Sequence, residues 1–241
     1  MSLSREGLTQ REISVRTGVP LGTVRNWQRG RNRSAPPKPR RRRRPPVPDL
    51  LTLPTPDYPY LLGFYLGDGC LSRQSNGSWC LRIVSDASYP ALLREAQAAM
   101  ESVSGGTAWQ RKRAGQHAFE LGLTWWHWPL VFPQHGPGRK HSRRIVLAHW
   151  QRNLIEQDPR PFLRGLIHSD GWRGLNRVRV KGKNYAYPRY QFSNRSQDIK
   201  ALFTWACDLL AIEWRPWGAH HISVARRGSV AKLDEFIGVK R

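Results

Sequence analysis

Two aspartates stand at the ends of two similar segments of the sequence. The first segment reads LLGFYLGDGC and contains Asp68, and the second reads LRGLIHSDGW and contains Asp170, about a hundred residues later. Both segments are apolar enough to form helices, and a glycine after each aspartate favours a helix end there. If the helices pair, two carboxylates meet where both helix dipoles are negative. A divalent cation would relieve that charge, and oxygen ligands favour Mg²⁺, with Mn²⁺ able to replace it.

Small residues have the same spacing in both segments. Residues four apart share one face of a helix, and small side chains on that face let two helix backbones approach closely. The residues expected at this contact are Gly63 and Gly67 in the first segment and Gly165 and Ser169 in the second. Two carboxylates brought together in this way suit the metal-assisted hydrolysis of a phosphodiester.

The charge of the chain indicates a polyanionic partner. The 241 residues include 40 Lys and Arg against 17 Asp and Glu, a formal net charge of +23, which is typical of nucleic-acid-binding proteins. The three cysteines form no CxxC pair, and no histidine has zinc-ligand spacing with them. The sequence has no long uncharged apolar run. We expect a soluble monomer of the cytoplasm, encoded by a bacterium or phage and associated with the nucleoid.

Residues 1–32 predict a helix-turn-helix whose first helix is incomplete. Thr9 and Glu12 fit a capping box, Gly18 fits the turn, and Pro20 fits the start of the second helix. The expected shared core consists of Ile13, Val19, Val24 and Trp27. The expected DNA-facing residues of the second helix are Arg25, Asn26 and Arg29. An ordinary helical hairpin without DNA contact is the alternative.

A linker and two halves follow. Residues 33–57 are rich in proline and include five consecutive arginines from Arg40 to Arg44, which favours an extended, unpacked chain. Residues 58–159 and 160–241 each begin with one of the two aspartate-containing segments. Apolar periodicity predicts the same order in both halves: helix, two strands, helix, two strands, helix. The fold class is therefore α+β.

These patterns also give approximate boundaries. In the first half we expect helices at 58–68 and 89–103, strands at 70–74 and 79–85, a second hairpin turning at 114–116, and then a helical region through Leu154. In the second half we expect helices at 161–170, 196–211 and 230–237, with strands at 172–181, 185–193, 214–217 and 220–226.

The two segments resemble the paired signature helices of the LAGLIDADG homing endonucleases, and the resemblance covers about residues 58–241. It implies a pseudo-symmetric monomer with two αββαββα halves, whose antiparallel sheets form a saddle over the major groove of double-stranded DNA. It also implies that Asp68 and Asp170 bind the metal, and that both strands are cut at the centre of a long site.

Four further positions match the pattern of that family. By this resemblance, a polar residue at the end of the second strand of each half contacts metal-bound water, and Asp86 and Asn194 hold these places. A lysine beyond the last strand of each half lies near the scissile phosphate, and Lys140 and Lys240 are available for this role. Asp86 departs from the more usual Gln or Asn.

Basic and amide side chains of the expected strands are candidates to face DNA, since arginine reads guanine and glutamine suits adenine. In the first half they are Arg73, Gln74, Arg82, Gln110, Arg111, Lys112 and Arg113. In the second half they are Arg177, Arg179, Lys181, Lys183, Arg189, Gln191, Arg226 and Arg227. The 11 tryptophans are expected mostly in the core. We expect His168 to face solvent or to support the neighbouring acid, without binding metal.

Three functions remain open on these grounds. The first is a Mg²⁺-dependent, site-specific DNA endonuclease of the kind associated with intron or intein homing. The second is a DNA-binding transcriptional regulator that keeps the fold without cleavage. Such regulators resemble this chain in joining the fold to a helix-turn-helix, but in the reverse order. The third is an intron maturase, which the helix-turn-helix disfavours because that unit suits B-form DNA. The retention of both acids favours the first.

Overall fold

The structure is a computed structural model that describes residues 7–30 and 44–238. Contacts divide the chain into two compact units, residues 1–45 and 46–241. The smaller unit contains α1 (Gln10–Thr17) and α2 (Leu21–Gln28). The predicted capping box is confirmed, because the Thr9 amide donates to the Glu12 carboxylate over 2.7 Å while the Thr9 hydroxyl accepts from the Glu12 amide. Gly18, with φ of 70°, ends α1 as predicted.

The core of the smaller unit is narrower than the sequence suggested. Ile13 and Val24 are buried, whereas Trp27 is 49% exposed and Val19 is only partly covered. The prediction of Trp27 as a core residue is therefore wrong, because helices of eight residues offer too little surface to enclose an indole. The side chains predicted to face DNA, Arg25, Asn26 and Arg29, are exposed.

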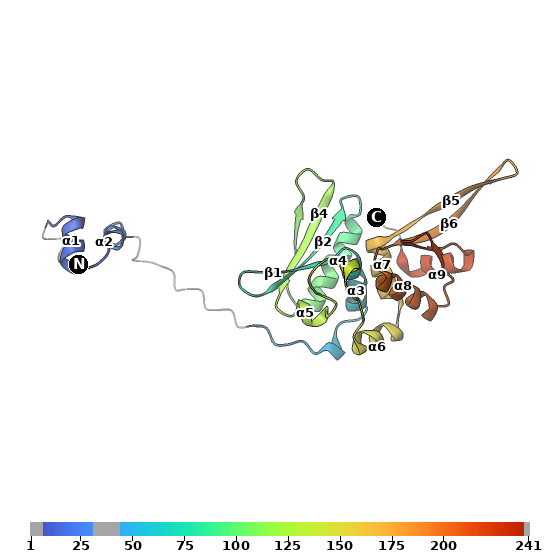
Figure 1. The fold of residues 1–241 in the computed structure, drawn as a ribbon, viewed down its shortest axis with the longest axis horizontal. Helices are drawn as coiled ribbons and strands as arrows, with labels where there is room; N and C mark the ends of the chain where they lie inside the picture. The colour runs from blue at the N-terminus through green and yellow to red at the C-terminus, as the bar shows by residue number, and fades with distance from the viewer. Residues whose placement is uncertain (1–6, 31–43, 239–241) are drawn as a thin grey trace. The chain divides into compact units, whose positions relative to one another are not determined.

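The larger unit follows the predicted order of elements in both halves (Figure 1). The first half consists of α3 (Asp57–Gly67), β1 (Cys70–Arg73), β2 (Trp79–Asp86), α4 (Pro90–Ser104), β3 (Trp109–Lys112), β4 (Ala118–Trp125), α5 (Trp128–Val131) and α6 (His149–Gln157). The second half consists of α7 (Arg160–Asp170), β5 (Gly171–Val180), β6 (Lys183–Ser193), α8 (Gln197–Leu209), β7 (Arg215–Trp217), β8 (His221–Val224) and α9 (Arg227–Ile237).

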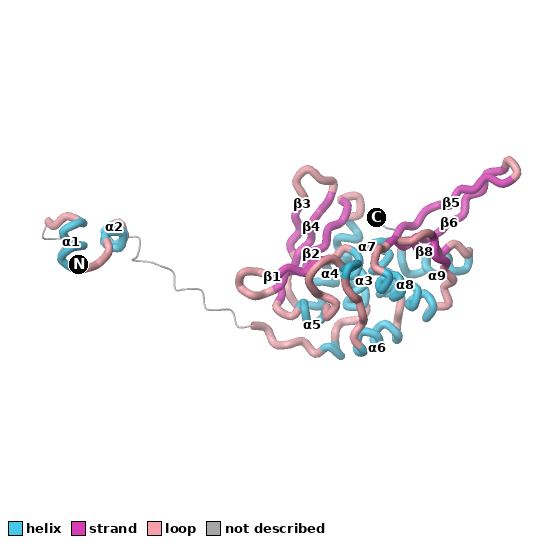
Figure 2. The backbone as a smooth tube through the Cα atoms, in the orientation of Figure 1, coloured by secondary structure: helices cyan, strands magenta, loops and turns pink. Residues whose placement is uncertain are grey.

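Each half builds one four-stranded antiparallel sheet with the same topology (Figure 2). The strand orders are β1-β2-β4-β3 and β5-β6-β8-β7. In both sheets the strand that follows the signature helix is an edge, and the second strand of that hairpin pairs with the last strand of the half. The repeated topology confirms the predicted α+β fold with two similar halves.

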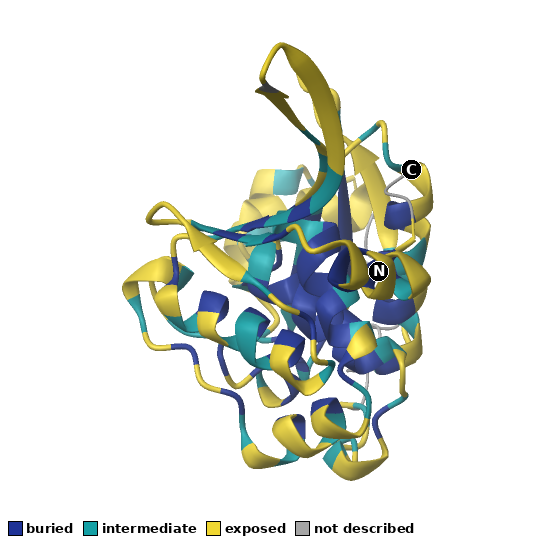
Figure 3. Ribbon diagram, turned by 90° about the vertical axis from the view of Figure 1, so that its right-hand side faces the viewer, coloured by how far each residue is buried: buried dark blue, intermediate teal, exposed yellow. Residues whose placement is uncertain are grey.

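One face of each sheet packs on the helices. In β2, Leu81 and Ile83 are fully buried while their neighbour Arg82 is not, as alternation along a strand requires. Helix α4 contributes Leu92, Ala96 and other apolar residues at helical spacing to the same core. The buried residues gather around α3 and α7, whereas the tips of the hairpins are exposed (Figure 3). The other face of each sheet is free of helices, and we call it the open face.

Two predictions about irregular segments are wrong. The helical region expected through Leu154 contains only the four-residue α5, a short 3₁₀ helix at Lys140–Ser142 and α6. Prolines and glycines interrupt residues 129–138, and a proline within a helix removes a hydrogen bond and clashes with the preceding turn. The end of the expected linker is also packed, since Leu50–Thr52 forms a 3₁₀ helix and Leu53 is buried in the core. Residues 31–43, which include most of the arginine run, lie outside the described residues.

Within residues 7–30 and 44–238, no helix combines the length and apolar character that crossing a bilayer needs.

Candidate active site

The two signature helices, α3 and α7, touch through their backbones. A Cβ atom added to Gly63 would collide with the carbonyl oxygen of Phe162, and one added to Gly165 would collide with that of Tyr60. An added Cβ at Gly67 would lie 2.5 Å from the Cβ of Ser169. The four small residues expected at this contact, Gly63, Gly67, Gly165 and Ser169, are therefore placed together, and only small residues fit there.

This packing brings the two acids to one end of the helix pair. Asp68 caps α3, and Asp170 is the last residue of α7. A Cβ added to Gly67 would lie 2.9 Å from Asp170 Oδ2, so this carboxylate lies against the last turn of α3, next to Asp68. Asp68 is exposed and Asp170 is partly buried. The site is therefore a shared end of two helices whose dipoles add negative charge to two carboxylates.

Asn194 holds the second acid in a fixed orientation. Its Nδ2 donates a 2.6 Å hydrogen bond to Asp170 Oδ2, and its Oδ1 accepts a 2.7 Å bond from the amide of Ser196. Ser196 in turn caps α8, where its hydroxyl accepts from the Ile199 amide. Both ends of the Asn194 amide are thus engaged, which fixes which oxygen of Asp170 faces it.

Asp86 does not take the corresponding place in the first half. Its Oδ1 accepts a 2.7 Å bond from the Ser88 amide and lies 3.2 Å from His117 Nδ1, at an exposed position. The hydrogen bonds from Ser88, followed by that of His117, lower the pKa of the Asp86 carboxyl.

The strand register explains this difference between the halves. Gly171 pairs with Phe192, two residues before Asn194, whereas Cys70 pairs with Arg82. If the β1–β2 register is extended by one residue, Gly69, which follows Asp68, lies opposite position 83. Ser85 is two residues beyond that position, as Asn194 is two residues beyond Phe192, so Ser85 corresponds to Asn194. In strand register Ser85, rather than Asp86, corresponds to Asn194, although Asp86 and Asn194 each accept a hydrogen bond from the amide two residues further on.

Lys140 lies beside both acids. Its Nζ donates to the carbonyl oxygen of Tyr65 and, over 2.9 Å, to that of Gly67, and it lies 4.8 Å from the centre of the Tyr65 ring. Burial lowers the pKa of the Lys140 ammonium to about 8, against the opposing attraction of Asp170 and Asp68. The predicted lysine of the first half is thus at the site. Lys240, its predicted counterpart, lies outside the described residues.

A cavity of about 1050 Å³ opens beside the acids. Its lining includes the basic residues Lys140, Arg139 and Arg143 together with Asp170 and Asn194. Basic side chains near a carboxylate can hold a phosphate group and a divalent cation together. The basic side chains neutralise the phosphate, and the carboxylate neutralises the cation.

The two acids of the site offer oxygen atoms as ligands. Among the residues that the structure describes, no group of three or more His, Cys, Asp or Glu side chains is placed to hold a metal ion. Zinc sites usually need such a group, whereas Mg²⁺ is bound through one or two carboxylates and keeps several waters. The carboxylates of Asp68 and Asp170 would therefore suit Mg²⁺ better than zinc.

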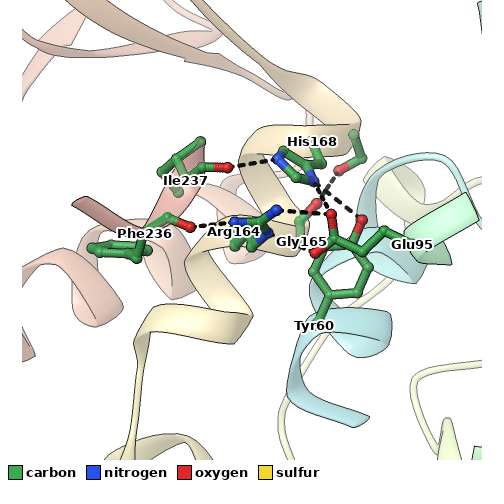
Figure 4. Close-up of polar contacts among 8 residues, drawn as sticks. Tyr60, Glu95, Arg164, Gly165, His168, Phe236 and Ile237 are labelled. Atoms are coloured by element: carbon green, nitrogen blue, oxygen red, sulfur yellow. Dashed lines mark hydrogen bonds and ion pairs between the residues drawn. The ribbon is translucent and has the colours of Figure 1, made fainter. Parts of the chain in front are cut away.

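His168 is buried, so the solvent-facing alternative of the two expected for it is wrong. It is 3% exposed, its Nδ1 lies 3.1 Å from the hydroxyl of Tyr60, and its Nε2 lies 3.0 Å from the carbonyl oxygen of Ile237 (Figure 4). Tyr60 belongs to α3 and Ile237 to α9, so this histidine joins the two halves. Local sequence patterns do not reveal this contact, because both partners are remote along the chain.

Arg164 makes a second link between the halves, one turn before His168. Its Nε and Nη2 donate to the two carboxylate oxygens of Glu95 over 2.6 and 2.8 Å, and its Nη1 donates to the carbonyl oxygen of Phe236 (Figure 4). A bidentate arginine–carboxylate pair of this kind is strong and directional. The pair helps to fix α7 against α4 and therefore the position of the second acid.

In the first half, two of the predicted DNA-facing arginines point from the open face. In the register Arg82 lies opposite Gly122 and Arg111 lies opposite Glu120. The Glu120 carboxylate is 3.6 Å from the Arg82 guanidinium and 2.6 Å from that of Arg111. The other candidates within β1 and β3 lie on the helix-side face by alternation, and two more lie outside the strands, in the connections between them. The candidates on the helix-side face are Arg73, Gln110 and Lys112, and those in turns are Gln74 and Arg113.

In the second half, burial of Tyr190 and Phe192 identifies the helix-side face of β6. Lys183, Arg189 and Gln191 therefore project from the open face. Arg177 and Arg179 share the other face with Arg173, which pairs with Asp234 at 2.6 Å. Of the remaining candidates, Lys181 lies in the β5–β6 turn, Arg226 pairs with Glu213 at 2.9 Å, and Arg227 begins α9.

Several tryptophans occupy the open faces, although most of the 11 pack in or against the core as expected. Trp128 and Trp125 are buried, but Trp109 is 38% exposed and Trp172 and Trp217 are each 51% exposed. The rings of Trp109 and Trp172 cover Gly122 and Gly174, where a Cβ would collide with the indole. Alternation along a strand predicts which residues share a face of the sheet, but it does not predict which face packs against the helices.

The sequence matches no family model, and none of the curated proteins matches it. Solved structures do resemble the chain. The LAGLIDADG homing endonuclease I-LtrWI bound to target DNA covers 76% of this chain and 84% of its own, with 8% identity and a TM-score of 0.49. The LAGLIDADG meganuclease I-AabMI bound to uncleaved DNA covers 74% and 82%, with 13% identity and a TM-score of 0.48.

A third such structure is the meganuclease I-SmaMI bound to uncleavable DNA, which covers 75% of this chain and 83% of its own, with 13% identity and a TM-score of 0.48. Each of these three matches covers about three quarters of this chain.

Proposed function

We propose that this chain is a Mg²⁺-dependent endonuclease of the homing type that cuts both strands of a specific DNA site. The observation that carries the proposal is the meeting of Asp68 and Asp170 at abutting helix ends, with the buried ammonium of Lys140 beside them. A structural role alone would not require two acids at the negative ends of two helices, since that arrangement is destabilising without a cation.

Each residue of the site has a distinct part in this proposal. Asp68 and Asp170 would hold Mg²⁺, which when bound activates water and stabilises the leaving oxygen of a phosphodiester. Asn194 fixes the orientation of Asp170 through its 2.6 Å hydrogen bond. Lys140 Nζ, with a pKa of about 8, can hold or release a proton near neutral pH, as a general acid or base requires.

Binding to DNA would rest on the positive charge of the chain and on its open faces. The net charge of +23 suits a polyanion, and Arg82, Arg111, Arg189 and Gln191 project from the sheets on the helix-free side. Arginine can form bidentate contacts with guanine and glutamine with adenine in the major groove. The smaller unit, with Arg25, Asn26 and Arg29 exposed on α2, would extend the contact along the duplex.

The test uses the full chain and a plasmid that carries the genomic flanks of its gene, joined without the gene. With Mg²⁺ or Mn²⁺, we expect a double-strand break that Asp68→Asn and Asp170→Asn each abolish. Both substitutions keep the shape of the side chain, so binding to the plasmid should remain. Asp86→Asn is the matched control, because it changes a carboxyl outside the site and should leave cleavage within about two-fold.

A DNA-binding regulator without cleavage is the second candidate, and one observation favours it. Lys140 Nζ already binds the carbonyl oxygens of Tyr65 and Gly67, so an ammonium can neutralise the acids where a metal would otherwise be needed. Tight, salt-sensitive binding to DNA that stays intact with Mg²⁺ or Mn²⁺, with an unchanged affinity in Asp68→Asn, would favour this candidate.

A further inference from the structure

The hairpin of β5 and β6 extends well beyond the rest of its sheet (Figure 1). β6 pairs with β8 only over Tyr190–Ser193, whereas it pairs with β5 from Lys183 onward. The corresponding β1–β2 hairpin of the first half pairs over only four residues. The outer part of the β5–β6 hairpin, residues 174–189, is therefore a two-stranded ribbon found in one half only, and we call it the ribbon.

Two tyrosines of the ribbon present their rings to solvent. Tyr185 and Tyr187 are 40% and 51% exposed, and their rings are parallel within 4° with centroids 6.1 Å apart. They lie on the open face, because they alternate with the buried residues of β6. Trp172, two residues after the second acid, lies on the same face at 51% exposure. Over six residues of strand, about 20 Å, exposed aromatic rings thus lead from the acids towards the ribbon tip.

The charge around these rings is positive throughout. Residues 171–196 contain seven Lys and Arg and no Asp or Glu. Arg189 lies on the open face with its guanidinium 4.6 Å from the Trp217 ring, and its Nε is buried without a hydrogen-bond partner. A hollow of about 470 Å³ on the ribbon is lined by Arg177, Arg179 and Tyr185, among others. Flat aromatic faces with cations and without acids match a partner that has flat rings and negative charges.

We propose that the ribbon binds unpaired nucleotides of a nucleic-acid strand, with bases stacked on Tyr185 and Tyr187 and phosphates held by its Lys and Arg side chains. In a duplex each base face is covered by its neighbours, and only base edges are accessible in the grooves. A tyrosine ring offers little to those edges, but it stacks on any exposed base. The proposal rests on the nucleic-acid binding proposed above but not on cleavage.

The tyrosines also support the ribbon itself, which the test must take into account. Tyr185 lies opposite Val178 and Tyr187 opposite Asn176, and such cross-strand pairs stabilise a ribbon that is marginal alone. The double substitution of Tyr185 and Tyr187 to Ile keeps strand propensity and apolar contact but removes the ring faces. The double substitution to Phe keeps both, and serves as the matched control.

The experiment measures the affinity of the full chain at one fixed salt concentration, without Mg²⁺, by fluorescence anisotropy. The probes are a single-stranded DNA, a single-stranded RNA of the same sequence, the fully paired DNA duplex, and that duplex with a central unpaired bubble. We expect the Ile variant to lose about ten-fold or more in affinity for single strands and the bubble, since each stacked base contributes about 5-fold to 100-fold. Duplex affinity should change less than two-fold, and the Phe variant should match the wild type.

Several results would overturn the inference. One is an equal loss of affinity for the duplex and the single strand in the Ile variant, and another is a Phe variant that binds as weakly as the Ile variant. A third is a wild-type chain that binds no single strand and binds the bubble no better than the paired duplex. A change in sedimentation of the Ile variant, with unchanged DNA binding, would assign the rings to self-association instead. The comparison of DNA with RNA identifies which strand supplies the unpaired bases. If the chain binds single strands as expected but leaves the plasmid of the cleavage test intact with Mg²⁺ and Mn²⁺, the proposed nuclease fails and the ribbon stands as inferred.

Discussion

Asn194 and Asp170 share a 2.6 Å hydrogen bond that runs from an amide to one carboxylate oxygen. The corresponding place in the first half belongs to Ser85, whose shorter side chain carries a hydroxyl. The two acids of the site therefore sit in different surroundings, although the helices that carry them are related by the repeat. The second acid is held from the side by a side chain that is itself fixed to the start of α8.

Removal of the Asn194 amide should slow cleavage. Asn194→Ala removes one restraint on the orientation of Asp170, and partners that orient a metal ligand typically contribute about 10-fold to 100-fold to activity or metal affinity. We expect a loss in that range in the single-turnover cleavage rate, with Asp86→Ala close to wild type. Equal losses in the two variants would show that Asp86, despite its contact with His117, serves the site as well.

Small residues between α3 and α7 should be indispensable for stability. Gly63→Ala and Gly165→Ala each put a methyl group onto a backbone carbonyl of the partner helix, which cannot rotate away. Overpacking of this kind typically costs about 1–3 kcal/mol, and more where backbone must shift. Urea unfolding should show this loss. Gly228→Ala, in a helix position with nothing within 4 Å of the new Cβ, should instead be neutral or stabilising by up to about 1 kcal/mol. Similar values for all three would contradict the close contact.

The burial of Lys140 should make stability depend on pH in the alkaline range. Its folded pKa of about 8 lies below the ordinary value of 10.5, so the unfolded chain binds the proton more tightly. Between these values the free energy of unfolding should therefore rise with pH, by at most about 3 kcal/mol from this group. Lys140→Met should remove that rise. The measurement is the difference between wild type and variant in urea unfolding from pH 7 to pH 10, in which other titrating groups cancel. A constant difference would contradict the lowered pKa.

Glu120 should restrain the DNA contacts of the first sheet. Its carboxylate is 8% exposed and contacts Arg82 and Arg111, so it offsets part of their charge. Glu120→Gln keeps the side-chain shape and removes the charge, which should strengthen DNA binding and steepen its dependence on salt by about one phosphate contact. The slope of the logarithm of affinity against that of salt concentration tests this. Glu213→Gln, which releases Arg226 at the edge of the other half, is the control and should change the slope less.

The repeat and most elements could be predicted from the sequence because local patterns carry them. Capping by Thr9, alternation in β2 and the small residues of the signature helices each reflect contacts within a few residues or a simple helix face. The breaks after Trp128 coincide with Pro129, Pro133 and Pro137, which interrupt a helix that the neighbouring apolar residues would favour.

Features that depend on contacts between distant segments were harder to predict. The burial of His168 arises from Tyr60 and Ile237, more than sixty residues away on either side. The correspondence in strand register between Ser85 and Asn194 depends on how each hairpin pairs, which local patterns do not reveal. Alternation alone could not tell whether Arg177 or Tyr185 faces the open side. The close approach of Asp68 and Asp170, in contrast, followed from glycine spacing alone.

The meeting of Gly67 with Ser169 makes the two halves non-interchangeable. Where Gly67 lies, there is no room for a Cβ atom, because the Cβ of Ser169 would be 2.5 Å away. A second copy of α7 in the place of α3 would set one serine against another at that point, and the helices would have to separate. Two copies of the second half therefore could not pair as α3 and α7 do. For Ser169 to be accommodated, the residue that faces it at position 67 must stay a glycine.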